Sequence, residues 1–282
     1  MCGRYASARK RQELLEEFQV QAGHAGESLE PDYNVAPTKP VYAVLTRRER
    51  EGSADGEAAA ATGSRPPAQR PPAESEAGTV PQVSRQLRVL RWGLVPSWAK
   101  DPSLGSKLIN ARVETVAVKP AFRRAFARRR CLLPADGYYE WQTKSAADGS
   151  TRKQPFFFRP RDGGVLAMAG LYELWRNPDV PADDPGAWLW TTVIITTQAG
   201  DEHGRIHDRM PMVIERARWG EWLDPARTDP GDLAGILMPA TSAGLDARVV
   251  SPTVNNVRNN GPSLIEPLPS GEDPGPATGS LF

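Results

Sequence analysis

The second residue of the chain is a cysteine, and its position gives it two reactive groups. A small residue after Met1 permits removal of the initiator methionine, which would leave Cys2 at the N-terminus. A terminal α-amine has a pKa near ~8, against ~10.4 for lysine, so it is more often uncharged at neutral pH. An uncharged amine attacks an aldehyde to give an imine, and the neighbouring thiol can then close a thiazolidine ring intramolecularly. Cys2 is therefore a candidate aldehyde trap, or else an ordinary residue after Met1.

Two further side chains have the chemistry of proton transfer. His207, in the run GRIHDRMP, carries an imidazole that titrates near neutrality. Its alternative role is that of a structural histidine bonded to a backbone carbonyl. Glu140, in ADGYYEW, stands among aromatic residues, where desolvation would raise the pKa of its carboxyl group and suit it to acid–base catalysis. Its alternatives are a strand residue facing solvent, or an ion pair with an arginine.

Other polar and aromatic residues suit binding of a phosphate backbone. Asn110 can donate and accept hydrogen bonds and Arg112 can bind a phosphate bidentately, although NARVET could equally be a capped turn with a solvated arginine. Arg4 is either a phosphate anchor or a surface charge. Trp98, in a loop after Pro96, is a candidate for stacking on bases, whereas strand spacing places Trp92 in the core.

A basic run precedes the second cysteine. The arginines at 123, 124 and 128–130 are more typical of a solvated helix face than of a nucleic-acid site, and Cys131 is expected to be a small buried apolar residue. The net charge of +1 is lower than that of a purely electrostatic DNA binder.

Composition indicates the compartment and excludes several classes of protein. The 282 residues are 39% hydrophobic and 24% charged, which is a globular composition. Two cysteines without a CxxC pair argue against a disulfide framework, and His24, His203 and His207 have no metal-ligand spacing. No apolar signal region and no run of about 20 apolar residues is present. We therefore expect a cytoplasmic monomer with no metal, cofactor or membrane contact.

Two segments stand apart from the rest of the chain. Residues 48–86 and 268–282 are rich in Ala, Gly, Pro, Ser and charged residues, and contain almost no large apolar side chain. Such segments cannot bury enough surface to offset their ordering entropy, so both are predicted to be disordered. The first would be a long loop between two strands of one domain.

The remaining chain predicts short helices and strands in an irregular order, which favours the α+β class. A helix is expected over 8–20 with Ser7 as its cap, and two more over 118–129 and 215–223. Strands are expected at 40–46, 86–94, 131–135, 137–141, 155–160, 165–175, 188–197 and 211–214.

Nine motifs in this order resemble one protein family. They are MCGRY at the N-terminus, YNVAPT (33–38), RWGLVPSWA (91–99), NARVET (110–115), PADGYYEW (134–141), QPFFF (154–158), IITT (194–197), IHDRMP (206–211) and VSPTVNNVRNNGPSLIEP (250–267). Together they are similar to the SOS-response-associated peptidase family over about residues 2–46 and 87–267. That family often has paired tryptophans where this chain has Ser97 and Trp98.

The resemblance implies an α+β domain over residues 2–267, with a β-barrel-like sheet core and flanking helices. It implies a groove for single-stranded DNA and a covalent thiazolidine link to an abasic deoxyribose. Cys2 would supply the amine and the thiol, Asn110 would position the N-terminus and the sugar oxygen, Glu140 would assist sugar opening, and His207 would shuttle protons. The implied DNA contacts are Arg4, Asn34, Pro37, Trp98, Arg112, Thr196 and Arg209.

Two other functions are compatible with the same residues. Cys2, Glu140 and His207 could form an N-terminal-nucleophile cysteine peptidase, acting on Met1 or on other chains. The chain could instead be a non-covalent single-strand-binding module. A weak β-elimination at the abasic site, from the imine before ring closure, is expected as a side activity of the covalent mechanism.

Overall fold

The structure is a computed structural model that describes residues 2–20, 28–48, 83–145, 150–181, 183–237 and 244–269. Most of the predicted insertion and tail, together with His24, lies outside these residues. Within them, no helix is long and apolar enough to cross a membrane.

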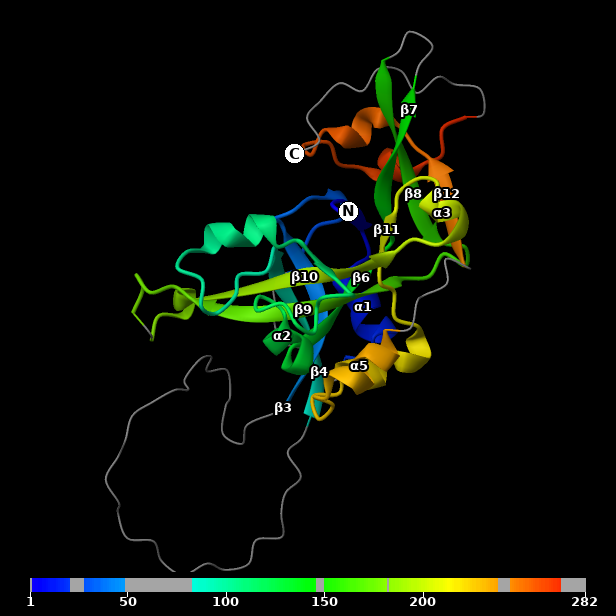
Figure 1. The fold of residues 1–282 in the computed structure, drawn as a ribbon. Helices are drawn as coiled ribbons and strands as arrows, with labels where there is room; N and C mark the ends of the chain where they lie inside the picture. Colours follow the sequence, from blue (N-terminus) through cyan, green and yellow to red (C-terminus); the bar gives the residue numbers. More distant parts are fainter. Residues whose placement is uncertain are drawn as a thin grey trace, which may run out of the picture.

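Five strands close into a barrel, and they form the centre of the fold (Figure 1). Their order is β10 (Trp188–Gln198), β4 (Val83–Trp92), β3 (Pro40–Arg48), β6 (Arg130–Ala135) and β9 (Leu166–Arg176), and β9 pairs again with β10 to complete the ring. The pairing of β10 with β4 is parallel and the other four are antiparallel. The predicted α+β class with a β-barrel core is confirmed.

A second, five-stranded sheet lies beside the barrel and carries the N-terminal strand (Figure 1). Its order is β12 (Leu245–Val249), β8 (Thr151–Pro160), β7 (Gly137–Ser145), β1 (Tyr5–Ser7) and β2 (Asp32–Val35).

Two short strands extend the barrel at β10. β5 (Asn110–Arg112) runs parallel to the end of β10, and β11 (Arg209–Pro211) pairs with it antiparallel. Both strands therefore reach the same end of the barrel.

The alternation of side chains along each strand divides the core in two. On β3, Tyr42 and Val44 pack against the helices, whereas Val41, Ala43 and Leu45 belong to a cluster that also contains Tyr5 and Tyr138 of the second sheet. Successive residues of a strand point to opposite faces, so the first set lines the outside of the barrel and the second fills its inside. The barrel interior is thus continuous with one face of the second sheet.

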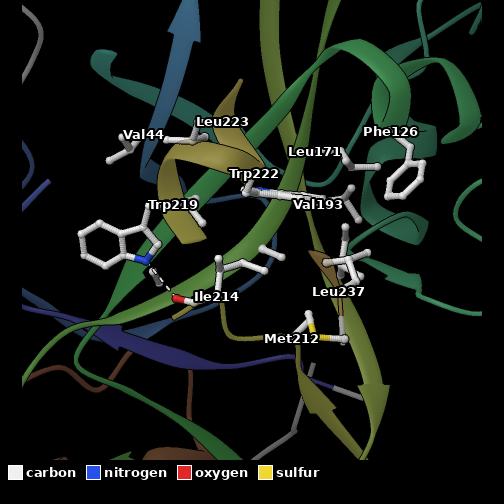
Figure 2. Packing of buried hydrophobic residues seen from close by; sticks show 14 of the residues in the cluster. Val44, Phe126, Leu171, Val193, Met212, Ile214, Trp219, Trp222, Leu223 and Leu237 are labelled. Carbon is white, nitrogen blue, oxygen red and sulfur yellow. Dashed lines mark hydrogen bonds between the residues drawn. The ribbon is translucent and has the colours of Figure 1, made fainter. Parts of the chain in front are cut away.

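Helices cover the outside of the barrel with large apolar side chains. They are α1 (Arg11–Glu17), α2 (Arg123–Arg128), α4 (Trp219–Leu223) and α5 (Pro230–Ile236). Figure 2 shows Trp222 in the same cluster as Leu171 and Val193, and Trp219 donating its indole N–H to the Ile214 carbonyl oxygen at 2.9 Å. The remaining helical elements are α3 (Asp201–Gly204) and the 3-10 turns Pro102–Lys107, Pro185–Ala187, Arg216–Arg218, Pro252–Asn255 and Pro262–Ile265.

Some predicted boundaries were wrong. Ser7 does not cap a helix, because its backbone pairs with β2, and α1 begins only at Arg11. The helix predicted over 118–129 is shortened to α2, since the residue before Pro120 is disfavoured in α-helical conformation and the chain forms turns there.

Two further elements in the C-terminal half are shorter than predicted. The strand predicted at 211–214 ends at Pro211, with a single further bridge between Val213 and Met168. The helix predicted over 215–223 is divided into a 3-10 turn at Arg216–Arg218 and the short helix α4 at Trp219–Leu223.

The arginine run divides between surface and interior. Arg123, Arg124 and Arg128 are exposed, as expected of a solvated helix face. Arg130 is buried instead, and its guanidinium donates to backbone carbonyl oxygens, among them that of Trp222 at 2.7 Å. It therefore ties the start of β6 to α4. Cys131 is fully buried, as predicted.

The close packing of the barrel interior around Gly170 can be tested by a measurement of stability. A Cβ added there would overlap Leu133 Cδ1 and lie 3.0 Å from both Cys131 Sγ and the Val193 carbonyl oxygen. Gly170→Ala should lower the free energy of unfolding by about 1–3 kcal/mol, measured by urea denaturation. Gly235→Ala is the control, because a Cβ at that helical position meets nothing, and it should be neutral or stabilising by up to about 1 kcal/mol. Equal effects of the two substitutions would contradict this packing.

Candidate active site

Cys2 lies at the junction between the barrel and the second sheet. Its side chain is fully buried in the cluster that contains Tyr5, Trp92 and Tyr138. β1 pairs with β7 so that Tyr5 is opposite Tyr138, and Glu140, two residues further along β7, shares the face of Tyr138. The pairing of these strands therefore brings a carboxyl group to the same face as the N-terminal residue.

Asn110 fixes the backbone of Cys2. β5 holds Asn110 opposite Ile194 of β10, and its side-chain Nδ2 donates to the Cys2 carbonyl oxygen at 2.8 Å. The other side-chain atom, Oδ1, is buried and has no hydrogen-bond partner among the described residues. Asn110 Oδ1 can therefore accept a hydrogen bond from an amine or from a sugar hydroxyl beside Cys2.

Glu140 is a buried acid. Its side chain is only 4% exposed, and burial raises the pKa of its carboxyl group to about 8. Desolvation disfavours the ionised form, so this carboxyl group carries its proton at neutral pH and can donate it. The alternative in which Glu140 faces solvent from its strand is wrong.

His207 faces Glu140 with its Nε2 atom, 3.8 Å from Glu140 Oε2. The backbone N–H of Arg209 donates to His207 Nδ1 at 3.0 Å, and this bond places the proton of the neutral ring on Nε2. Burial lowers the pKa of His207, which favours the neutral ring at pH 7. Asp208 Oδ1 lies 3.1 Å from Nδ1 and the Arg209 carbonyl oxygen 3.3 Å from it, so either oxygen can accept a hydrogen bond from Nδ1–H of the charged ring. The pair can therefore relay a proton between acid and base.

The Cys2 thiol is held in its protonated form. Burial raises the pKa of this thiol far above its ordinary value, and the neighbouring Glu140 adds to the rise. A cysteine that acts as the first nucleophile of a peptidase needs a thiolate, which a positively charged or polar surrounding stabilises. This site instead suits a mechanism in which the thiol reacts after another group.

Some of the predicted DNA contacts are accessible to solvent. Trp98 is 62% exposed, Arg112 is exposed and Pro37 is half-buried. Thr196 is buried, and its carbonyl oxygen accepts a hydrogen bond from Arg209 Nη2 at 2.6 Å.

Arg4 and Asn34 are buried. Arg4 is 2% exposed, so the alternative of a surface charge is wrong. Its Nη1 donates to Asn34 Oδ1 at 2.7 Å and to the Val254 carbonyl oxygen at 3.0 Å, and its guanidinium lies over the Trp141 ring. The Asn34 amide donates in turn to three backbone carbonyls, those of Val254, Asn256 and Asn259. These contacts join β1 and β2 to the C-terminal segment, and a role for either residue in binding DNA stays a prediction.

Sequence reasoning missed several residues around the site. Tyr5 and Tyr138 flank Cys2 in the buried cluster, and Glu114 binds the guanidinium of Arg209. The two-residue spacing of Tyr138 and Glu140 on one strand was a signal for the first group. No comparable signal pointed to Glu114, since its partner is 95 residues away. Among the described residues, no group of three or more His, Cys, Asp or Glu side chains could hold a metal ion.

The sequence of this chain is similar to one protein family and to several named proteins. The family described as "SOS response associated peptidase (SRAP)" matches residues 1–257. "Abasic site processing protein YoqW" of Bacillus subtilis (strain 168) is 34% identical over 266 residues, which cover 94% of this chain and 99% of that protein. "Abasic site processing protein HMCES" of Gallus gallus is 33% identical over 210 residues, 66% of this chain and 59% of that protein.

The fold is also shared with a solved structure. A crystal structure of a protein from Bacteroides thetaiotaomicron superposes with a TM-score of 0.67 at 22% identity, and covers 95% of this chain and 100% of that one.

The raised pKa of Glu140 predicts how stability changes with pH. The folded protein keeps the proton of Glu140 up to about pH 8, whereas the unfolded chain releases it near the ordinary value of 4.5. Stability linked to this proton is therefore present below about pH 4.5 and is lost as the pH rises to about 8. Glu140→Gln removes this loss, so its melting temperature should rise relative to the parent by about 5 °C or more between pH 5 and pH 9.

Glu221→Gln, a substitution of an exposed carboxylate in α4, is the control for a change of one charge. If the melting temperatures of the parent and Glu140→Gln change with pH in the same way across this range, the result would contradict a buried, protonated carboxyl group at Glu140.

Proposed function

Because this chain belongs to the SOS response associated peptidase (SRAP) family, we propose that it captures abasic sites in single-stranded DNA through a covalent thiazolidine link to Cys2. The observation that carries the proposal is the position of Cys2. Its carbonyl oxygen is held by Asn110 at 2.8 Å, beside a buried acid and a histidine that lie 3.8 Å apart. Relatives over nearly the full chain are named abasic site processing proteins, which supports an aldehyde-bearing DNA lesion as the substrate.

The first steps require a free amine and an open sugar. Removal of Met1, by the protein itself or by another enzyme, exposes the α-amine of Cys2. The abasic sugar is mostly a closed hemiacetal. Glu140 donates its proton to the ring oxygen as that oxygen leaves the anomeric carbon, and the anomeric hydroxyl loses its proton to solvent and becomes the aldehyde oxygen. The amine attacks the resulting aldehyde carbon, and a water molecule leaves as the imine forms. Asn110 Oδ1 accepts a hydrogen bond from the amine or from the sugar and holds the two together.

Ring closure completes the link. The Cys2 sulfur adds to the imine carbon and the thiol proton passes to the imine nitrogen, so the overall reaction releases one water. His207, neutral and with its Nε2 proton toward Glu140, carries protons between these steps. A thiol that keeps its proton until this stage is consistent with the order of events, since the amine and not the sulfur attacks first. The product would shield the lesion, and the imine allows a slow β-elimination if closure fails.

Two arginines and a tryptophan supply the DNA contacts of this proposal. Arg112 and Arg209 contact backbone phosphates, and Trp98 stacks on a base that flanks the lesion. The peptidase alternative has less support, because the Cys2 thiol is buried and protonated and His207 is neutral.

The central experiment uses the protein without Met1, mixed with a labelled single strand that carries one abasic site and run on a denaturing gel. The parent should give a slow band that survives denaturation, while Cys2→Ala gives none. Cys2→Ser, like Cys2→Ala, keeps the amine but has no thiol, so either variant should give a band only after borohydride reduction of the imine.

Matched controls decide between the functions. An intact strand of the same sequence, and a protein that retains Met1, should give no band. Non-covalent binding without any band would favour the simple DNA-binding module, and Cys2-dependent cleavage of peptides would favour the peptidase.

The rate of capture should depend on pH in a bell shape. The α-amine must be uncharged, which favours higher pH up to about 8. Glu140 must be protonated, and its pKa of about 8 makes the rate fall above that value. Glu140→Gln should slow capture by about 100-fold or more and lose the fall at high pH. An unchanged rate in this variant would remove Glu140 from the mechanism.

A further inference from the structure

The guanidinium of Arg209 is already bound to a carboxylate. Its Nη1 donates to Glu114 Oε1 at 2.6 Å and its Nη2 to Glu114 Oε2 at 3.2 Å, a two-pronged pairing of the kind that arginine also makes with phosphate. Arg209 Nη2 also donates to the Thr196 carbonyl oxygen at 2.6 Å. The fork that the proposed function assigns to a DNA phosphate is therefore occupied within the chain.

The carboxylate lies close to both arginines of this end of the barrel. Thr196 of β10 is opposite Arg112 of β5 on one side and Pro211 of β11 on the other, so the two flanking strands carry Arg112 and Arg209. Glu114 follows Arg112 by two residues, and the hydrogen bond from Arg209, followed by weaker attraction to both arginines, lowers the pKa of its carboxyl group. The Glu114 side chain is 49% exposed and that of Arg209 only 12%, so the carboxylate can move away more readily than the guanidinium.

We propose that Glu114 is a built-in competitor for the DNA phosphate that Arg209 binds. The inference rests on the proposed function, because it needs single-stranded DNA as the ligand. In the free protein the carboxylate neutralises the Arg209 fork, and a backbone phosphate must displace it to bind. The same atoms of Arg209 cannot bind both anions at once. Any strand, intact or damaged, must therefore displace Glu114 and binds more weakly than it would without this carboxylate.

The displacement affects intact and damaged strands differently over time. Binding to an intact strand is reversible, so a weaker contact shortens the time that the protein stays there. A covalent link to an abasic site does not depend on that contact once it has formed. Glu114 thus favours release from undamaged DNA while leaving the final yield of captured lesions unchanged.

The test measures binding of Glu114→Gln to an intact labelled single strand by fluorescence anisotropy. The amide keeps the size of the side chain and an oxygen acceptor for Arg209, but it removes the charge. Affinity at low salt should rise about three- to ten-fold, and the slope of log affinity against log salt should steepen by roughly 0.7, the value for one single-strand phosphate contact. Glu221→Gln makes the same change of net charge in α4, where Glu221 pairs with Arg218, and should leave the affinity within two-fold, roughly.

A double substitution identifies the partner. Arg209→Gln should lower affinity, and Glu114→Gln should have no further effect in that background. A gain that persists without Arg209 would reflect general charge repulsion and overturn the proposal. Lower affinity in Glu114→Gln would also overturn it, since Glu114 would then position Arg209 for DNA; an unchanged affinity would show that the carboxylate does not compete.

Capture of an abasic strand, measured with the same proteins, separates this inference from the proposed function. Glu114→Gln should reach the final yield of the parent, while excess intact strand should slow its capture more than that of the parent. If the parent forms the link but Glu114→Gln changes neither binding nor competition, only the proposed role of Glu114 is overturned. A parent that forms no link would overturn the proposed function instead.

Discussion

The structure depends on the burial of an ionisable carboxyl group beside the N-terminal residue. Glu140 lies on the face of β7 that meets the barrel, and desolvation there raises its pKa to about 8. The same burial keeps the Cys2 thiol protonated and the His207 ring neutral. One physical effect therefore sets the protonation of three groups, and each is left in the form that suits acid-assisted attack by an amine.

The two sheets are what make such a site possible. A closed barrel leaves an apolar interior, and the second sheet packs Tyr5 and Tyr138 against it, so that an N-terminal strand can enter an apolar region. β10 then holds the polar side of the site, because it pairs with β5 and β11 at neighbouring positions. β10 thus fixes both Asn110 and the segment from His207 to Arg209. The proposed catalytic residues and the proposed phosphate contacts are therefore held by the same strand.

Sequence reasoning located the barrel strands and named candidate reactive residues, but it did not give the surroundings of those residues or the short strands β1, β2, β5 and β12. The alternating apolar runs located the barrel strands, and the ordered motifs identified the family. The helix cap predicted at Ser7 was wrong because pairing with β2 outweighs local helix propensity. The burial of Arg4 and the pairing of Arg209 with Glu114 were not predictable from spacing, since their partners lie far along the chain. Contacts of this kind form only when segments far apart in the sequence fold together.

The measurement that tests the central claim most directly is the mass and thiol content of the captured product. The denatured adduct should weigh as much as the Met1-free protein and the abasic strand together, less one water. After digestion the DNA should remain on the N-terminal peptide, and only Cys131 should react with an alkylating reagent, because the Cys2 sulfur is closed into the ring. An adduct on a lysine, or one in which both thiols are alkylated, would contradict the account.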